Sequence, residues 1–136
     1  MKAEVFRRKF RCVPESLPSA RGFLREVLGG EVAADRLSSI TIAMGEVWQN
    51  IIRHAARGGN PDYEFSVAVM VGDVEIGILT RDNAPPNDPA EWDWAERPPE
   101  EGGLGMQIIE SIAVKASYAA EADGNSSELF FARVIN

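Results

Sequence analysis

The sequence predicts an α+β fold, a two-layer sandwich in which a mostly antiparallel sheet carries helices on one face. Alternating apolar and polar residues, typical of half-buried strands, recur in neighbouring pairs at 63–80 and 114–135. Two helical patterns lie together near the start of the chain, between the first strand pattern and the next pair. Strands that neighbour one another in sequence favour antiparallel pairing, and grouped helices then cover one face of the sheet.

The composition predicts a single domain over residues 1–136. A chain of 136 residues can bury most of its apolar side chains in one core. Its 14 basic and 21 acidic residues give a net charge of -7, which excludes the positive surface of a non-specific nucleic-acid binder. No apolar run approaches the ~20 residues that span a bilayer, and the start of the chain lacks a secretory signal. We therefore expect a cytoplasmic protein with no direct nucleic-acid or membrane partner.

The first half of the chain predicts five elements. They follow the order strand, helix, helix, strand and strand, at residues 1–12, 17–28, 35–58, 63–71 and 74–80. Cys12, the only cysteine, is expected to fill the core as a small apolar residue. Asp35 is suited to cap the second helix, and glycines end both helices. Gly72-Asp73 predicts a two-residue turn between the two later strands.

The second half begins with an irregular segment. Five prolines and seven acidic residues between Arg81 and Gly103 exclude regular structure. Such a stretch inside a compact domain is more often a functional lid than a linker, so we predict a lid over about 83–101. A helix at 102–112 and a pair of strands at 114–122 and 126–135 complete the chain, with Asp123-Gly124-Asn125 as the turn between these strands.

Glu46, Asn50 and His54 lie four residues apart on the second predicted helix and share one polar stripe. Val47 and Ile51 follow one position behind and face a core, which leaves the carboxylate and the amide facing outward. An acid and an amide one turn apart suit a hydrated Mg²⁺, which takes few protein oxygen ligands. Taken alone, such a spacing is more often an amphipathic helix with a solvated face.

Two later motifs add to this stripe, one acidic and one rich in glycine. Asp82 ends a strand, where a carboxylate can accept a hydrogen bond from an exocyclic amino group such as that of adenine; small Ala84 leaves room for a flat ring. Gly102-Gly103-Leu104-Gly105-Met106 opens the last helix, where backbone N–H groups and the helix dipole attract phosphate. Each motif alone also has an ordinary explanation as a turn.

Together the three motifs, Glu-x-x-x-Asn-x-x-x-His-Ala, Asp-x-Ala-x-Pro and Gly-Gly-Leu-Gly-Met, resemble the N, G1 and G2 boxes of the GHKL ATPases in order and spacing. This superfamily includes gyrase, heat-shock chaperone ATPases, histidine kinases and mismatch-repair ATPases. The resemblance implies a Bergerat-type fold that binds ATP and Mg²⁺. The residues it places at the nucleotide are Asn50, which also reaches the metal, Asp82, Ala84, Pro86, Gly102, Gly103, Leu104, Gly105 and Met106, with Ser127 near the adenine.

Within the superfamily, the chain resembles the anti-sigma-factor serine kinases of bacterial partner-switching systems. That resemblance implies an ATP-dependent serine/threonine protein kinase and anti-sigma factor that phosphorylates an anti-sigma-factor antagonist, with Glu46 as the general base. A sigma factor or another regulator is the implied partner. Two other interpretations stay open. One is a nucleotide-binding module that sequesters its partner without transfer, and the other is a simple ATPase that directs water with the same Glu46.

The charged residues beside these motifs have plainer interpretations. Arg53 and Arg57 are interpreted as solvated helix charges, with a phosphate or partner contact as the alternative. His54, the only histidine, is expected to brace the end of the helix rather than to act in catalysis. Apolar residues of the first strand and the first helix are the candidates for the face of a homodimer or for the face that binds another partner.

Overall fold

The protein folds into five strands and three helices over residues 3–55, 59–86 and 103–135, which the computed structural model describes. The elements follow the chain in the order β1 (Glu4–Cys12), α1 (Ser16–Leu28), α2 (Ala34–His54), β2 (Asn60–Val71), β3 (Glu75–Asp82), α3 (Gly103–Ile112), β4 (Ala113–Glu121) and β5 (Gly124–Ala132). This order agrees with the order of elements that the sequence predicts.

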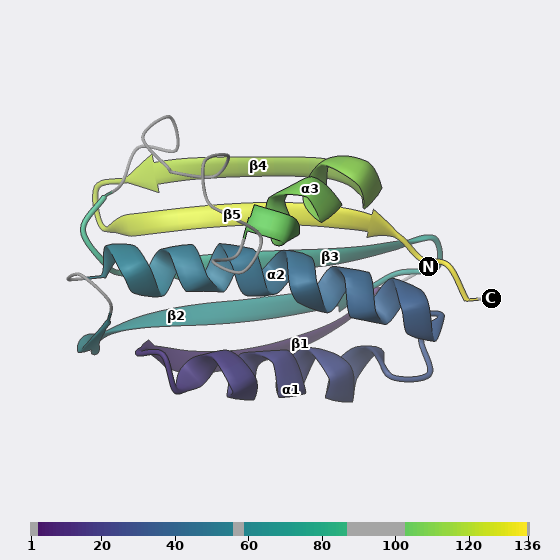
Figure 1. Ribbon diagram of the computed structural model, residues 1–136, viewed down its shortest axis with the longest axis horizontal. Helices are drawn as coiled ribbons and strands as arrows, with labels where there is room; N and C mark the ends of the chain where they lie inside the picture. Colours follow the sequence, from purple (N-terminus) through teal and green to yellow (C-terminus); the bar gives the residue numbers. More distant parts are fainter. Residues whose placement is uncertain (1–2, 56–58, 87–102, 136) are drawn as a thin grey trace.

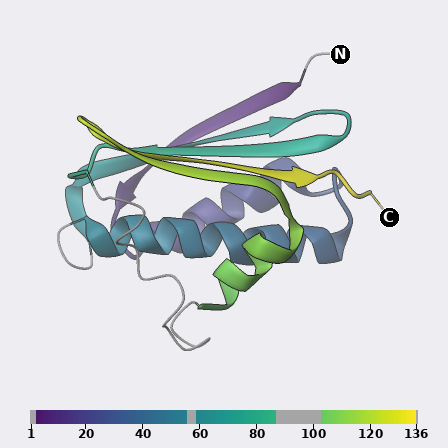
Figure 2. The same ribbon diagram turned by 90° about the horizontal axis from the view of Figure 1, so that it is seen from above.

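The strands form one sheet in which every neighbouring pair is antiparallel, in the order β1-β2-β3-β5-β4. Figures 1 and 2 show all three helices on one face of this sheet, and no described element covers the other face. The predicted α+β sandwich is therefore confirmed. None of the helices in the described ranges is long and apolar enough to cross a membrane.

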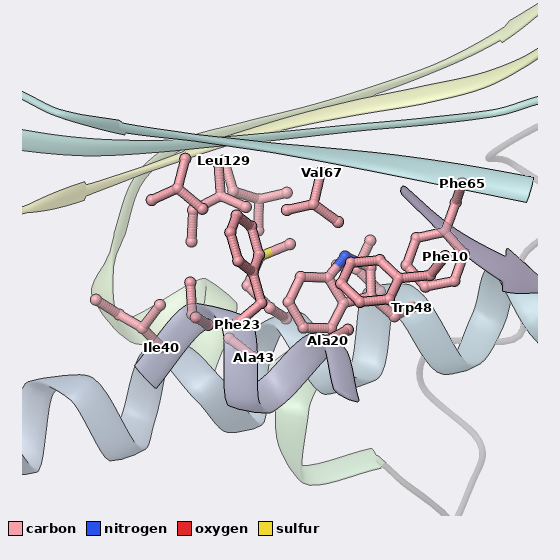
Figure 3. Packing of buried hydrophobic residues seen from close by; sticks show 14 of the residues in the cluster. Phe10, Ala20, Phe23, Ile40, Ala43, Trp48, Phe65, Val67 and Leu129 are labelled. Atoms are coloured by element: carbon pink, nitrogen blue, oxygen red, sulfur yellow. The ribbon is translucent and has the colours of Figure 1, made fainter. Parts of the chain in front are cut away.

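Helix α2 is fixed across the sheet by the contacts of Trp48 with two strands. The ring of Trp48 stacks on Phe65 of β2 with 6.4 Å between centroids, and Phe65 stacks on Phe10 of β1 at 5.4 Å (Figure 3). The indole N–H of Trp48 donates a hydrogen bond of 3.1 Å to the hydroxyl of Thr80 on β3. Trp48 is fully buried, so these contacts set the depth and the rotation of α2. Asn50, two residues further along the helix, takes its position from them.

The ends of α2 differ from the prediction. The helix begins at Ala34 with Ala33 at its N-cap and no side-chain cap, so Asp35 is not the capping residue. The carboxylate of Asp35 instead accepts a hydrogen bond from the backbone N–H of Arg36 in the first turn, where its charge complements the helix dipole. The helix ends at His54 rather than at 58, and residues 56–58 lie outside the described ranges.

The hairpin of β2 and β3 also differs in detail. β2 begins at Asn60, because Asn60 pairs with Cys12 of β1, and not at 63. Its connection to β3 contains three residues, 72–74, rather than the predicted two. The backbone N–H of Gly72 donates to the carbonyl of Glu75 over 2.9 Å, and Val74 is 75% exposed in the turn. Cys12 is fully buried, as predicted.

Gly124 begins β5 rather than lying in the predicted turn, and it packs against the backbone of Asp82. Gly124 has a φ of 150°, and an ideal Cβ there would lie 1.8 Å from the carbonyl oxygen of Asp82. We expect Gly124→Ala to lower the free energy of unfolding by about 3 kcal/mol, because the strands must separate or the backbone must strain. Urea denaturation measures the loss.

The matched control for this change is Gly22→Ala on α1, where a Cβ would meet nothing within 4 Å. Alanine is favoured over glycine inside a helix by about 1 kcal/mol, so this variant should be as stable as the unmodified protein or more so. Equal stability of Gly124→Ala and the unmodified protein would contradict the close approach of β5 to β3.

Candidate functional site

The polar stripe of α2 forms a buried network. Glu46 and Asn50 are each 2% exposed, on a helix that packs against α3 (Figure 1). Nδ2 of Asn50 donates to Oε2 of Glu46 over 3.4 Å, and a guanidinium N–H of Arg53 donates to Oδ1 of Asn50 over 3.3 Å. The prediction that the carboxylate and the amide face outward is therefore wrong. His54, the third member of the stripe, is exposed.

The side-chain oxygens of this network determine which kind of ligand α2 can bind. The side-chain oxygens of Asn50 and Glu46 are ligands of the kind that Mg²⁺ prefers, and a site with few protein oxygens leaves room for phosphate and water. Arg53 is partly buried and bonded to Asn50, so its interpretation as a solvated charge is wrong. It places a cation beside the amide oxygen. Arg57 lies outside the described residues.

The carboxylate of Asp82 is held in one orientation at the end of β3. It is 6% exposed, and its Oδ1 accepts hydrogen bonds from the backbone N–H of Ala84 at 3.0 Å and from Nδ2 of Asn125 at 2.9 Å. Burial raises the pKa of Asp82 above its ordinary value, and the hydrogen bonds from Asn125 and Ala84 offset part of this rise. Asp82 is therefore a positioned acceptor in a poorly solvated place.

Asn125 is a site residue that the sequence analysis assigned only to a turn. It lies on β5 directly opposite Asp82 in the strand register, and its Nδ2 also donates to the carbonyl of Pro85 over 3.1 Å. One side chain thus ties the carboxylate to the segment that follows β3. The role of Asn125 follows from the pairing of β3 with β5. The sequence does not show this pairing, because α3 and β4 separate the two strands along the chain.

A small hollow lies between α2 and the ends of β3 and β5. Residues from all three elements bound it: Val47, Ile51, Thr80, Asp82, Asn125, Ser126 and Ser127. Its open volume of about 10 Å³ is room for one water molecule. Ser127 is 4% exposed, and its buried hydroxyl has no hydrogen-bond partner among the described residues. Because an unsatisfied buried hydroxyl costs stability, it points to a water or ligand atom in this hollow.

The glycine motif lies on the same side of the sheet. Gly103, Leu104, Gly105 and Met106 are the first residues of α3, and the backbone N–H groups at a helix start can bind an anion. Figures 1 and 2 show α3 beside α2 on the covered face. Both Gly102 and residues 87–101 of the predicted lid lie outside the described residues.

The two G1 residues that follow Asp82 differ in burial. Ala84 is 3% exposed and packs with the core, whereas Pro86 is exposed at the last described position before residue 87. The structure therefore brings together Asp82, Ala84 and Ser127 near the hollow, and Glu46 with Asn50 on the adjoining helix. It does not bring the exposed Pro86 into either group.

Comparison with known proteins gives the family. Residues 10–129 match the family model of the histidine kinase-like ATPase domain. A search of curated protein sequences finds no match. Among solved structures, the fold is similar to the histidine kinase domain of a blue-light activated histidine kinase from Erythrobacter litoralis EL346, with a TM-score of 0.52 and 14% identity over 86% of this chain. It is also similar to the catalytic domain of histidine kinase ThkA, with a TM-score of 0.58 and 13% identity over 96% of this chain.

This chain spans different shares of the two similar structures. This chain spans 59% of the Erythrobacter histidine kinase domain and 99% of the ThkA catalytic domain. At such identities the likeness shows the fold alone. The family model, in contrast, covers most of the sequence, including the Glu46–Asn50 network and Asp82. GHKL domains bind ATP, usually with Mg²⁺, and the oxygen ligands and the orphaned Ser127 hydroxyl fit such a ligand. The chain belongs to the histidine kinase-like ATPase domain family, as a GHKL-type ATP-binding domain.

Proposed function

We propose that this chain is an ATP-dependent serine/threonine protein kinase and anti-sigma factor that phosphorylates an anti-sigma-factor antagonist in the cytoplasm. The observation that carries the proposal is Glu46, a buried carboxylate bonded to Asn50 one turn later. A domain that only held nucleotide would have no need of a carboxylate here. A neutral glutamine would accept the same hydrogen bond, and burying it would cost less than burying a charge.

In the proposed transfer of the γ-phosphate, Glu46, Arg53 and the backbone at the start of α3 have separate roles. Glu46 accepts the proton of the acceptor hydroxyl while the hydroxyl oxygen bonds to the γ-phosphorus. The bond from the γ-phosphorus to its bridging oxygen breaks, and ADP leaves with that electron pair. The guanidinium of Arg53 supplies positive charge beside Asn50, and the backbone N–H groups that open α3 hold phosphate oxygens.

Separate parts of the site would hold the metal ion and the adenine ring of ATP. The side-chain oxygen of Asn50, together with phosphate oxygens and water, would hold Mg²⁺, which neutralises phosphate charge when it is bound. Asp82 accepts a hydrogen bond from the amino group of adenine, while Asn125 keeps the carboxylate in place. The hydroxyl of Ser127 reaches the same adenine ring through the water-sized hollow.

The acceptor in this proposal is a serine or threonine on another protein. His54, the one histidine of the printed sequence, is the last residue of α2, and we assign it to bracing the end of that helix rather than to accepting phosphate. In the proposed switch, the chain binds a sigma factor or another regulator. Phosphorylation of the antagonist stops the antagonist from releasing that partner.

Transfer of labelled γ-phosphate tests the proposal. The protein is incubated with labelled ATP and Mg²⁺, alone and with the antagonist-domain proteins encoded by neighbouring genes. We expect label on a serine or threonine of one antagonist. Release of free phosphate in every mixture would instead identify a simple ATPase. Nucleotide binding with no turnover would identify a sequestering module, and either result would overturn the kinase proposal.

Removing the side chain of Asn125 is expected to change the pH dependence of ATP binding. The hydrogen bond from Asn125 lowers the pKa of Asp82, so Asn125→Ala raises this pKa further. Because the ionised carboxylate is the acceptor, affinity falls as the pH drops through the pKa of Asp82. In Asn125→Ala this fall should begin at a higher pH. Titrations with ATP at a series of pH values measure the shift.

The control for this change is Asn60→Ala, which removes an amide from the start of β2 rather than from the Asp82 site. Its pH profile should match that of the unmodified protein. A profile of Asn125→Ala that overlays the unmodified one would show that Asn125 does not set the ionisation of Asp82.

A further inference from the structure

β1 forms one margin of the sheet and offers an unpaired backbone edge. It pairs only with β2, so no described strand lies along its other side (Figure 1). At such a margin the N–H and C=O groups of alternate residues have no strand partner, which makes the edge a template for an added strand. The sheet therefore ends in nine residues, Glu4–Cys12, that a further extended segment can join.

The middle of β1 carries two exposed cations on the side that faces away from the helices. Arg7 and Lys9 pair in the strand register with Ala68 and Ser66, which carry no charge. Neither cation forms an ion pair with any residue in the described ranges. Because these two residues alternate along the strand, both side chains project from the same face at the margin of the sheet.

The other two basic residues of β1 already have acidic neighbours. Arg8, on the helix side, forms an ion pair with Glu26 of α1 at 3.3 Å. Arg11 pairs in the strand register with Glu64 of β2. Positive charge that no directly opposite carboxylate offsets therefore lies in the middle of the strand, at the two cations described above.

The start of β1 is apolar and exposed. Val5 is 40% exposed and the adjacent Phe6 is 39% exposed. Charge that served only to protect the edge from association would not leave two neighbouring apolar side chains open on the same strand. The first helix, the other element that the sequence suggested for a partner face, differs from β1, because its apolar residues Ala20, Phe23, Leu24 and Leu28 are buried in the core.

We propose that the edge of β1 binds an extended acidic segment of a partner protein as a sixth strand of the sheet. Every strand pair in this sheet is antiparallel, so the added strand runs from the end of β1 towards its start. Its acidic residues lie opposite Lys9 and then Arg7. Two apolar residues follow, opposite Phe6 and Val5. The pattern recognised is therefore acidic-x-acidic-apolar-apolar, and the inference does not depend on the proposed kinase activity.

The two kinds of contact have separate roles in this binding. Main-chain hydrogen bonds to the edge supply affinity whatever the sequence of the partner. Directly opposite side chains on neighbouring strands lie about 5 Å apart, so a carboxylate across from each cation forms a favourable cross-strand pair. The spacing of Arg7 and Lys9 then selects a partner whose acidic residues alternate.

Charge disfavours two other arrangements. Two copies of β1 side by side would oppose basic residues to basic residues, so a second copy of the chain does not suit this edge. β4, the strand at the other margin, carries one basic residue, Lys115, and one acidic residue, Glu121, and Glu121 is already bonded to Arg81. That margin has no comparable excess of positive charge.

Nuclear magnetic resonance of the nitrogen-15-labelled protein tests the proposal with a capped synthetic peptide, Thr-Thr-Glu-Thr-Glu-Val-Val-Thr. We expect the amide signals of β1 to shift, those of β4 to stay in place, and amide exchange along β1 to slow. N-methylation of the central threonine and the second glutamate retains both side chains but removes two successive N–H donors, one of which must face β1. This peptide should bind about tenfold more weakly. Equal binding would overturn the addition of a strand.

Lys9→Glu tests the charge pattern, because it opposes like charges at the first acidic position of the peptide. It should weaken binding about tenfold, and a peptide with lysine at that position should recover the affinity. Lys115→Glu on β4 is the matched control and should bind within about twofold of the unmodified protein. The same spectra show that each variant is folded. Equal affinities of the two variants, or tighter binding of an oligonucleotide or of anionic vesicles than of the peptide, would overturn the proposal.

Discussion

Asp82→Asn is expected to lower the affinity for ATP about 100-fold. The carboxylate of Asp82 is 6% exposed, and in the proposed site it accepts a hydrogen bond from the adenine amino group. Asparagine replaces one oxygen by a donor and removes the charge, and hydrogen bonds to charged groups contribute about 1.5–3 kcal/mol. A loss of ~2.7 kcal/mol corresponds to a factor of 100. Calorimetric titration measures it, with Asp73→Asn in the distant β2–β3 turn as the control.

This loss should occur without loss of folding. The raised pKa of Asp82 means that the folded protein binds a proton there more tightly than the unfolded chain does. The stability from this proton is present below the ordinary pKa of the carboxyl and is lost as pH rises through the folded-state value. At neutral pH the neutral Asp82→Asn variant should therefore melt at the same temperature or higher. Unchanged ATP affinity in that stable variant would show that Asp82 does not bind the adenine ring.

Glu46→Gln is expected to slow phosphate transfer about 10²–10⁴-fold while ATP still binds. Glutamine preserves the size of the side chain and its acceptor for Nδ2 of Asn50, so the network of α2 remains. It cannot take the proton of the acceptor hydroxyl. Single-turnover transfer to the antagonist measures the rate, and calorimetry measures the affinity for ATP. The expected pattern is a large loss of rate with an affinity within about threefold of the unmodified protein.

The control for Glu46→Gln is Glu75→Gln, which removes an exposed carboxylate at the far end of β3. It should leave both rate and affinity unchanged. Transfer at the normal rate by Glu46→Gln would exclude Glu46 as the general base. Loss of ATP binding in the same variant would instead assign Glu46 to metal or nucleotide binding.

The fold was predictable because the apolar residues of its strands and helices recur with clear periods. β2 alternates so regularly that Phe65, Val67 and Val69 all face the core, and α2 presents Met44, Val47 and Trp48 to the sheet. The errors lie at element ends, where local hydrogen bonds decide. Asp35 fits a capping position by residue type, yet the chain starts the helix one residue earlier, and the turn after β2 takes in Val74.

The candidate site was only partly predictable, because burial and long-range pairing are properties of the packed fold. The spacing of Glu46 and Asn50 is visible in the sequence, but their burial is a property of how α2 packs in the folded chain. The pairing of Asn125 with Asp82 requires β5 to lie beside β3, and residue type alone makes Asn125 look like part of a turn. Arg53 likewise became a site residue only through its contact with Asn50.

Calorimetric titration with ATP and with ADP, each with and without Mg²⁺, is the most direct test of the nucleotide site. The unmodified protein should bind both nucleotides, more tightly when Mg²⁺ is present. In Asn50→Ala the benefit of Mg²⁺ should be largely lost, because the amide oxygen that holds the metal is gone. If the unmodified protein binds neither nucleotide with or without Mg²⁺, the site formed by α2, β3 and β5 is not a nucleotide site, and the account is wrong.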